Sequence, residues 1–305
     1  MLPAYAELHC LSNYTFLRGA SHPEELVQQA CKLGYQSIAV TDECSLAGVV
    51  RAYGEAKHLG MKLIVGSEFT LQDGLKIILL ATNLNGYGNL CELITLARSR
   101  CEKGEYKLAR EDLNHRIDDN LVLWCPAESS QTLQQDAQWL SQTFTGRCWI
   151  AVELLRGADD DHWLAQCRAL SAESSLPLVA TGDVHMHVRQ RRRLQNIVTA
   201  IRLNQTVAQC GAALHPNGER YLRPIGRLAK LYPADLLIET VNIAELCQFS
   251  LAEIKYEYPE EVIPHGESPA AYLRRLTYEG VAVRYPQGLP DKVRGIIEYE
   301  LALIS

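Results

Sequence analysis

Short apolar runs alternate with amphipathic segments along the first two thirds of the chain. Such short apolar runs are typical of buried strands. The dipeptide Asp73-Gly74 separates two such runs and predicts a tight turn between them. The predicted strands span Tyr5–Cys10, Ser37–Val40, Lys62–Phe69, Leu75–Ala81, Leu121–Trp124, Trp149–Glu153 and Leu178–Thr181.

The segments between these strands show the 3.6-residue spacing of helices. The clearest start is Ser21-His22-Pro23-Glu24, with a Ser cap, Pro in the first turn and Glu three residues after the cap, and Gly34 ends this helix. Alternating strands and helices predict an α/β fold, either parallel βα units closed into a barrel or a doubly wound sheet. The other predicted helices span Ala47–His58, Tyr87–Arg100, Thr132–Phe144, Asp161–Ser174 and Gln190–Leu203.

The alternation stops near residue 203, and the remaining chain is expected to be mostly helical. We divide the chain into a barrel over residues 1–203, an extension and linker over 204–259, and a C-terminal segment over 260–305. Pro259 belongs to the run of prolines and glycines that marks the linker. The last predicted helix stops without a Gly, Asn or Pro terminator, so we expect a fragment of a longer protein.

Composition places the chain among ordinary globular proteins. Hydrophobic residues make up 47% and charged residues 22%, which excludes a disordered or collagen-like chain. No apolar run approaches the roughly 18 residues of a membrane span, and the first residues lack the basic region of a signal peptide. The ten cysteines include no CxxC pair and fit free thiols in a reducing compartment. We therefore expect a cytoplasmic protein without membrane contact.

Basic residues concentrate in one segment of an otherwise acidic chain. The chain has 30 Lys and Arg against 36 Asp and Glu, whereas residues 189–230 hold nine basic side chains and one acid, a local net charge of +8. Such a segment either forms a solvated surface or meets an anionic partner. Contact with DNA phosphate or an acidic protein face would explain cations at a helix start, where they oppose the dipole. The candidates are Arg189, Arg191, Arg192 and Arg193.

Side chains with metal-ligand chemistry recur where the predicted strands end. Parallel strands bring their carboxyl ends to one rim of a barrel, and Asp183 and His185 leave their strand on the same face. Imidazole and carboxylate groups bind zinc, manganese or iron, so their recurrence at one rim is what a multinuclear metal site needs. The candidates at the strand ends are His9, Glu43, Glu68, Cys125, Asp183 and His185.

Three further residues belong to the same strand-end segments as these candidates or to another strand end. Asp42 either supports the pocket or caps the following helix. Glu153 ends the sixth strand and is expected to pair with a nearby cation, and His187 is expected at the rim. No phosphate-binding loop, serine nucleophile elbow or dinucleotide fingerprint occurs in the sequence.

Several motifs resemble those of the PHP (polymerase and histidinol phosphatase) domain family. Within that family the chain is similar to the amino-terminal part of bacterial C-family DNA polymerases, relatives of the DNA polymerase III α subunit. Its segments resemble the error-prone branch used in damage tolerance and induced mutagenesis, and residues 260–305 resemble the beginning of a polymerase palm. The motifs that carry the resemblance are Glu7–Gly19, Ala39–Glu43, Val65–Phe69, Val179–His185 and Tyr256–Pro259.

The resemblance implies a distorted seven-stranded βα barrel that holds metal ions and hydrolyses phosphoesters in its active members. In some replicative polymerases the domain is a metal-dependent 3′–5′ exonuclease. Five of the nine metal-ligand positions of the family are kept here. They are His9, Glu68, Cys125, Asp183 and His185. Four positions depart from the pattern and hold Leu11, Arg18, Glu43 and Lys76.

The departures change the chemistry of the pocket. Leucine and arginine cannot ligate a metal, and lysine can do so only when deprotonated. Arg18 and Lys76 would instead neutralise Glu43, Glu68 and Asp183, which otherwise repel one another. We therefore expect a salt-bridge network in place of the metal. The alternative is a reduced site in which kept ligands hold one Zn²⁺ or Mn²⁺ ion.

Two functions follow from these alternatives. The first is a non-catalytic scaffold domain of an error-prone DNA polymerase, with no catalytic residue and no cofactor in this chain. The second is a metal-dependent phosphoesterase or 3′–5′ exonuclease. The resemblance also implies that the parent polymerase uses Mg²⁺ and binds DNA, a sliding clamp and a Y-family-like accessory protein.

Overall fold

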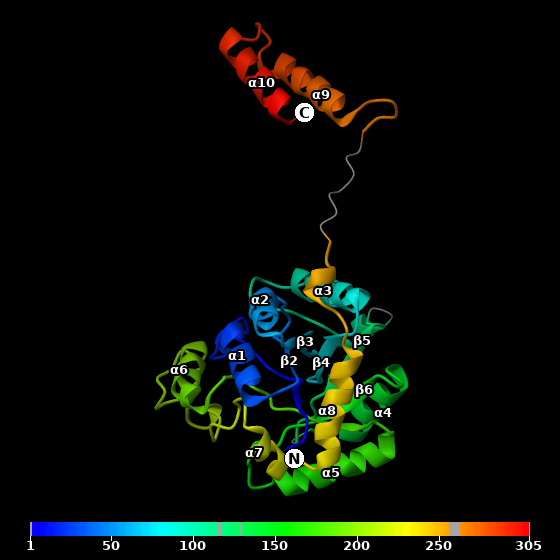
Figure 1. Cartoon of the computed structure of the whole chain (residues 1–305), viewed down its shortest axis with the longest axis vertical. Coiled ribbons are helices and arrows are strands. Elements are labelled where there is room, and N and C mark those ends of the chain that lie inside the picture. Colours follow the sequence, from blue (N-terminus) through cyan, green and yellow to red (C-terminus); the bar gives the residue numbers. More distant parts are fainter. Residues whose placement is uncertain (1, 115–116, 129, 256–262, 305) are drawn as a thin grey trace. The chain divides into compact units, whose positions relative to one another are not determined.

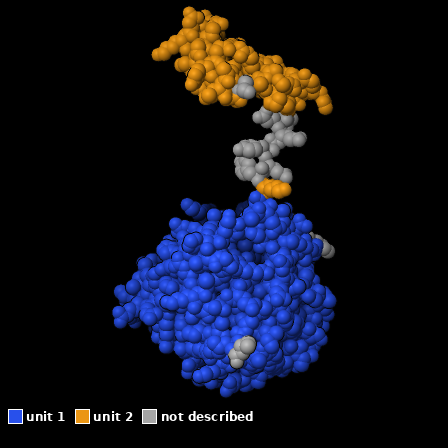
Figure 2. All heavy atoms as spheres, in the orientation of Figure 1, with its two compact units in different colours: residues 1–254 blue, residues 255–305 orange. Residues whose placement is uncertain are grey.

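The computed structural model describes residues 2–114, 117–128, 130–255 and 263–304. The chain forms two compact units, Met1–Ile254 and Lys255–Ser305, which Figure 2 shows in blue and orange. The motif Tyr256–Pro259 and the linker proline within it lie outside the described residues, as does the predicted boundary between residues 259 and 260. Each unit is therefore considered by itself.

One curved sheet of seven strands organises the first unit, and its strands lie in chain order from β1 to β7. This confirms the predicted α/β class and the seven-stranded PHP-type sheet. β1 is shorter than predicted, and Cys10 beyond it forms an isolated parallel bridge with Val184. The strands are β1 (Ala6–Glu7), β2 (Ser37–Val40), β3 (Lys62–Thr70), β4 (Lys76–Ala81), β5 (Asn120–Trp124), β6 (Cys148–Val152) and β7 (Leu178–Ala180).

The direction of β4 departs from the parallel βα units of the predicted barrel, whereas the tight turn predicted at Asp73-Gly74 is confirmed. β4 runs antiparallel to both β3 and β5, while the other neighbouring strands pair in parallel. The physical reason is the short connection at Asp73-Gly74, which reverses the chain and is too short for the helical crossover that a parallel pair requires. Gly74 adopts the left-handed conformation, with φ of 89°. As a result the start of β4, at Lys76, lies where the neighbouring parallel strands end.

Helices cover the outer face of the sheet. Their positions agree with the predicted helices to within a few residues, and Gly34 ends α1 in the left-handed conformation with φ of 78°. The start of α1 corrects the prediction, because the N-cap is His22 and the Ser21 hydroxyl bonds instead to His187. The helices are α1 (Pro23–Leu33), α2 (Val49–Leu59), α3 (Leu84–Ser99), α4 (Leu133–Thr143), α5 (Asp160–Ser174) and α6 (Arg192–Arg202).

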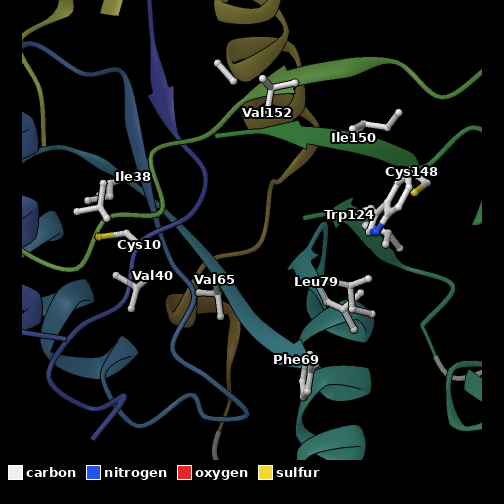
Figure 3. Packing of buried hydrophobic residues seen from close by; sticks show 14 of the residues in the cluster. Cys10, Ile38, Val40, Val65, Phe69, Leu79, Trp124, Cys148, Ile150 and Val152 are labelled. Atoms are coloured by element: carbon white, nitrogen blue, oxygen red, sulfur yellow. The ribbon is translucent and has the colours of Figure 1, made fainter. Parts of the chain in front are cut away.

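Two apolar clusters pack on opposite faces of the sheet, because successive strand residues point to opposite sides. Figure 3 shows part of the outer cluster, which includes Val40, Trp124 and Ile150. The inner cluster contains strand residues such as Leu8 together with Ile243 and its neighbours at the end of α8 (Ala234–Leu246). Residues 204–254 therefore contribute to the core of the first unit.

The chain after residue 203 is mostly helical where the structure describes it, as predicted. It contains α7 (Ile225–Leu231) and α8 in the first unit, and α9 (Pro269–Arg284) and α10 (Asp291–Ile304) in the second (Figure 1). Ser268 caps α9 by accepting a hydrogen bond from Ala271 N. Among the described helices, none is both long enough and apolar enough to cross a membrane.

Candidate functional site

The residues predicted from the strand ends lie together at one rim of the sheet. His9 occupies the centre, with its Nε2 atom 2.7 Å from Glu68 Oε2 and 3.6 Å from Asp183 Oδ1. His185 Nε2 lies 3.1 Å from the same Asp183 oxygen. The Cys125 Sγ atom lies within 4.8 Å of ligand atoms of His9 and Glu153. The rim position follows from the parallel strands, whose carboxyl ends share one edge.

Arg18 connects Glu43 to this group. Its Nη1 atom donates to a Glu43 carboxylate oxygen and to Glu68 Oε1, the latter at 2.7 Å. Tyr106 donates a further hydrogen bond of 2.9 Å to Glu43 Oε1. All six candidates are thus brought together, and Arg18 points into the pocket as the sequence predicts.

Lys76 reaches the pocket from β4. Its Nζ atom lies 2.9 Å from Glu68 Oε2 and 4.0 Å from Asp183 Oδ1. Only the reversed direction of β4 makes this contact available, because the first residue of a parallel strand would lie at the opposite edge. The predicted contacts of Lys76 with the acids are present in the structure.

Two further charged residues, Glu153 and Arg220, belong to the pocket, although neither is among the six predicted ligand candidates. Glu153 was expected to pair with a cation, and its Oε1 atom lies 3.1 Å from His9 Nδ1. Arg220, from the segment after the barrel strands, forms an ion pair with Asp183. Its backbone carbonyl also accepts a hydrogen bond of 3.0 Å from His185 N. The sequence signals the general excess of positive charge around Arg220 but not its place in the pocket.

His9 is held as a cation. Its two ring nitrogens contact carboxylate oxygens of Glu153 and Glu68, and a carboxylate can only accept, so both nitrogens carry a proton. Burial and Lys76 act to lower the pKa of His9, but its bonds to Cys125, Glu153 and Glu68 outweigh them and raise the pKa to about 10. A protonated imidazole has no lone pair to offer a metal ion.

His185 is held neutral. The Gln195 side-chain amide donates to His185 Nδ1 at 2.8 Å, which leaves the ring proton on Nε2, facing Asp183. Burial, with Arg18 and Lys76 nearby, lowers the pKa of His185 to about 3. Both ring nitrogens of His185 are therefore engaged by protein groups.

Positive and negative charges balance in the pocket. Burial would raise the pKa of Glu68, but Lys76, His9 and Arg18 hold it well below its usual range. Burial acts in the same direction on Glu153, and Lys76 and His9 lower its pKa to about 2. Four carboxylates thus face four cations. The carboxylates belong to Glu43, Glu68, Glu153 and Asp183, and the cations to His9, Arg18, Lys76 and Arg220.

Asp42 organises the loop that carries Arg18. It accepts hydrogen bonds from the backbone and hydroxyl groups of both Ser12 and Thr15, between 2.6 and 3.1 Å. The N-cap of α2 is Gly48, so the alternative that Asp42 caps this helix is wrong. Asp42 instead supports the pocket from behind. His187 lies at the edge, hydrogen-bonded to Ser21.

The predicted basic candidates contact their own unit. Arg191 forms an ion pair with Glu25, and Arg189 Nη2 lies 3.5 Å from Glu219 Oε1. Arg192 donates to backbone carbonyls of the 215–216 segment. Arg193 is exposed and forms no ion pair with any residue that the structure describes. Three of the four candidates therefore have structural roles within the first unit.

Comparison with known proteins agrees with this fold and its strand-end motifs. Residues 7–146 match the PHP domain family. This match covers 140 of the 305 residues, so the PHP assignment applies to that part of the chain.

Curated relatives are similar to this chain over its whole length. An error-prone DNA polymerase of Dechloromonas aromatica (strain RCB) is 56% identical over 100% of this chain and 30% of its own length. One from Pseudomonas aeruginosa is 51% identical over 100% of this chain and 29% of its own length. The chain thus spans just under a third of the length of these relatives.

Among solved structures, an amidohydrolase from Chromobacterium violaceum superposes with a TM-score of 0.47 at 16% sequence identity. The superposition covers 60% of this chain and 88% of that chain.

Proposed function

We propose that this chain is a non-catalytic PHP domain of an error-prone DNA polymerase and acts as a scaffold for the polymerase. The observation that carries the proposal is the set of four side-chain cations bound to the four acids of the pocket. In the active members that the family resemblance implies, metal ions supply this positive charge. Here the protein's own side chains supply it.

A divalent metal ion does not fit this arrangement. Among the described residues, two groups have ligand-type atoms within 4.8 Å of one another, and both include His9. They are His9, Cys125 and Glu153, and His9, Glu68 and Asp183. His9 directs its Nε2 proton at Glu68, and Lys76 and Arg220 already bind the two carboxylates. A metal ion would have to displace a proton and at least one fixed cation. It would also lie close to His9, Lys76 and Arg220, whose positive charges repel a divalent cation.

The scaffold function follows from this chemistry. Ion pairs join the residues just after β1 and β6 to one another, β3 to β4, and Asp183 to Arg220. We infer that they stabilise the rim at which active members of the family would bind metal ions. Nucleotide addition, with its Mg²⁺ ions and its contacts with DNA, a sliding clamp and an accessory protein, would belong to the longer polymerase. We place that polymerase in the cytoplasm, in damage tolerance, translesion synthesis and induced mutagenesis. Residues 260–305 would begin its palm.

A nuclease assay tests the proposal. The purified 305-residue chain is incubated with 5′-labelled primer–template DNA and added Mn²⁺ or Zn²⁺, and we expect neither 3′–5′ degradation nor primer extension. His185→Ala is the matched control, because it removes a residue kept from the family pattern. Chelator-sensitive degradation that disappears in His185→Ala would contradict the scaffold proposal.

One observation favours the alternative function. The three ligand-type residues His9, Glu68 and Asp183 are buried and converge on one point, as a reduced site for a single Zn²⁺ or Mn²⁺ ion would require. Such a site would make the chain a metal-dependent phosphoesterase or exonuclease. It would also require Arg18 and Lys76 to leave the acids that they contact, which is a structural change that crystallography with added metal would detect.

A further inference from the structure

Helix α6 turns its apolar side chains outward. Leu194, Ile197 and Ile201 follow one another along one face of the helix and are 37%, 47% and 59% exposed. The buried positions of the same helix include the polar residues Gln195 and Thr199. This is the reverse of the usual surface helix, whose apolar face packs on the core.

The polar face of α6 has a structural use, whereas the apolar face has none within the first unit. Gln195 holds His185 through its 2.8 Å hydrogen bond, and Thr199 Oγ1 donates to Gln195 O. Single exposed apolar residues are common on proteins, but an aligned apolar row rimmed by polar residues marks an interaction site.

Unpaired arginines flank this row. Arg193 lies four residues before Ile197, and Arg202 lies four residues after Val198, so each stands beside the apolar residues on the helix surface. Both are exposed, and neither forms an ion pair with a residue in the described part of the chain. We call the surface formed by Leu194, Ile197, Ile201, Arg193 and Arg202 the α6 stripe.

We propose that the α6 stripe is the docking site for an amphipathic helix of a separate protein, whose apolar face is bordered by Asp or Glu residues. Apolar side chains at the centre with arginine at the edge are typical of protein interfaces. Helix-on-helix docking uses anchors at the i, i+3 and i+7 spacing that Leu194, Ile197 and Ile201 provide. The unpaired cations on both sides give the complementary charge for an acidic partner.

Other occupants of the α6 stripe fit less well. DNA phosphates would engage the arginines but would leave the apolar row without contacts. A second copy of this chain would bring like charges together across a symmetric interface. The α9 and α10 helices of the second unit carry five basic and four acidic side chains, so they lack the excess of acid that the stripe would attract.

A peptide-binding experiment tests this proposal on the full 305-residue chain. The probe is a fluorescent helical peptide of about 18 residues, five turns, with Leu at helical spacing and Glu on both borders. We expect saturable binding by fluorescence anisotropy, weakened about tenfold by Ile197→Ser. Ile238→Ser on α8 is the matched control, because Ile238 is similarly exposed at 56%, and it should bind as the parent does.

A charge exchange sharpens the test. The double variant Arg193→Glu/Arg202→Glu should lose the Glu-bordered peptide and gain a Lys-bordered version of the same peptide. Circular dichroism confirms that the variants are folded, which is expected because all the substituted side chains are exposed.

Three results would overturn the proposal. One is equal binding of a peptide with the same composition and scrambled order. A second is a dimer of the chain, seen by sedimentation, that Ile197→Ser dissociates, because the stripe would then be covered by a second copy. A third is binding by the 305-residue chain but not by a longer polymerase that contains it, because the polymerase would then cover the stripe itself.

Discussion

Replacing Arg18 with Gln removes one of the four cations of the pocket while keeping much of its volume. Arg18 contacts Glu43 and Glu68, and Glu68 is fully buried while Arg18 is 23% exposed. Removing one partner of a fully buried pair costs about 3–5 kcal/mol. Because water reaches Arg18 and Glu68 keeps His9 and Lys76, we expect a smaller loss of unfolding free energy, on the order of 2 kcal/mol.

Thermal unfolding followed by tryptophan fluorescence measures this loss. All four tryptophans lie in the first unit, between residues 124 and 163, so the signal reports on that unit alone. For a unit of this size the expected loss lowers the Tm by roughly 4–8 °C. Arg100→Gln is the matched control, because Arg100 pairs with Asp112 on the surface, and its loss should lower the Tm less than Arg18→Gln does.

The double variant Arg18→Gln/Glu43→Gln separates charge from packing. It restores equal numbers of positive and negative groups, so we expect it to recover part of the stability lost in Arg18→Gln. If the parent, Arg18→Gln and Arg100→Gln all have the same Tm, the reasoning about charge balance is refuted.

Three further predictions follow from the pocket. Arg18→His replaces a cation with a neutral ligand, so isothermal calorimetry should detect Zn²⁺ or Mn²⁺ binding that the parent lacks; equal binding by both proteins would contradict this. The raised pKa of His9 means that its stabilising charge is fully present below about pH 6.5 and is lost as the pH rises through about 10. The difference in Tm between the parent and His9→Asn should therefore shrink over that range, and a constant difference would show that His9 is not a cation. Asp42→Ala leaves the hydrogen-bond donors of Ser12 and Thr15 unpaired, and urea unfolding should show a loss of roughly 2–4 kcal/mol, with Asp161→Ala as an exposed control.

The gathering of the site residues could be predicted because it depends on a simple geometric rule. His9, Glu43 and Asp183 each follow a strand, and Glu68 lies near the end of β3, which runs in the same direction as those strands. Their positions along the chain therefore determine the rim on which they lie. The sequence also predicts that cations take the place of metal ligands, because arginine keeps its charge in any environment. The ion pairs of Arg18 and Lys76 in the structure agree with that reading.

Other features depend on tertiary contacts that no local pattern encodes. Arg220 lies in an irregular segment and reaches Asp183 only because the chain returns to the rim after α6. The outward orientation of α6 was hidden for the same reason, since periodicity identifies an apolar face but not the side to which it points.

The metal content of the purified protein tests the central claim most directly. The chain is produced without chelator in medium containing Zn²⁺ and Mn²⁺, its metals are quantified by mass spectrometry, and its crystals are examined for anomalous scattering at the pocket. We predict no stoichiometric metal and no anomalous peak, with Arg18 and Lys76 on the acids. About one equivalent of metal, with a peak between His9, Glu68 and Asp183 and both cations turned to solvent, would contradict the account.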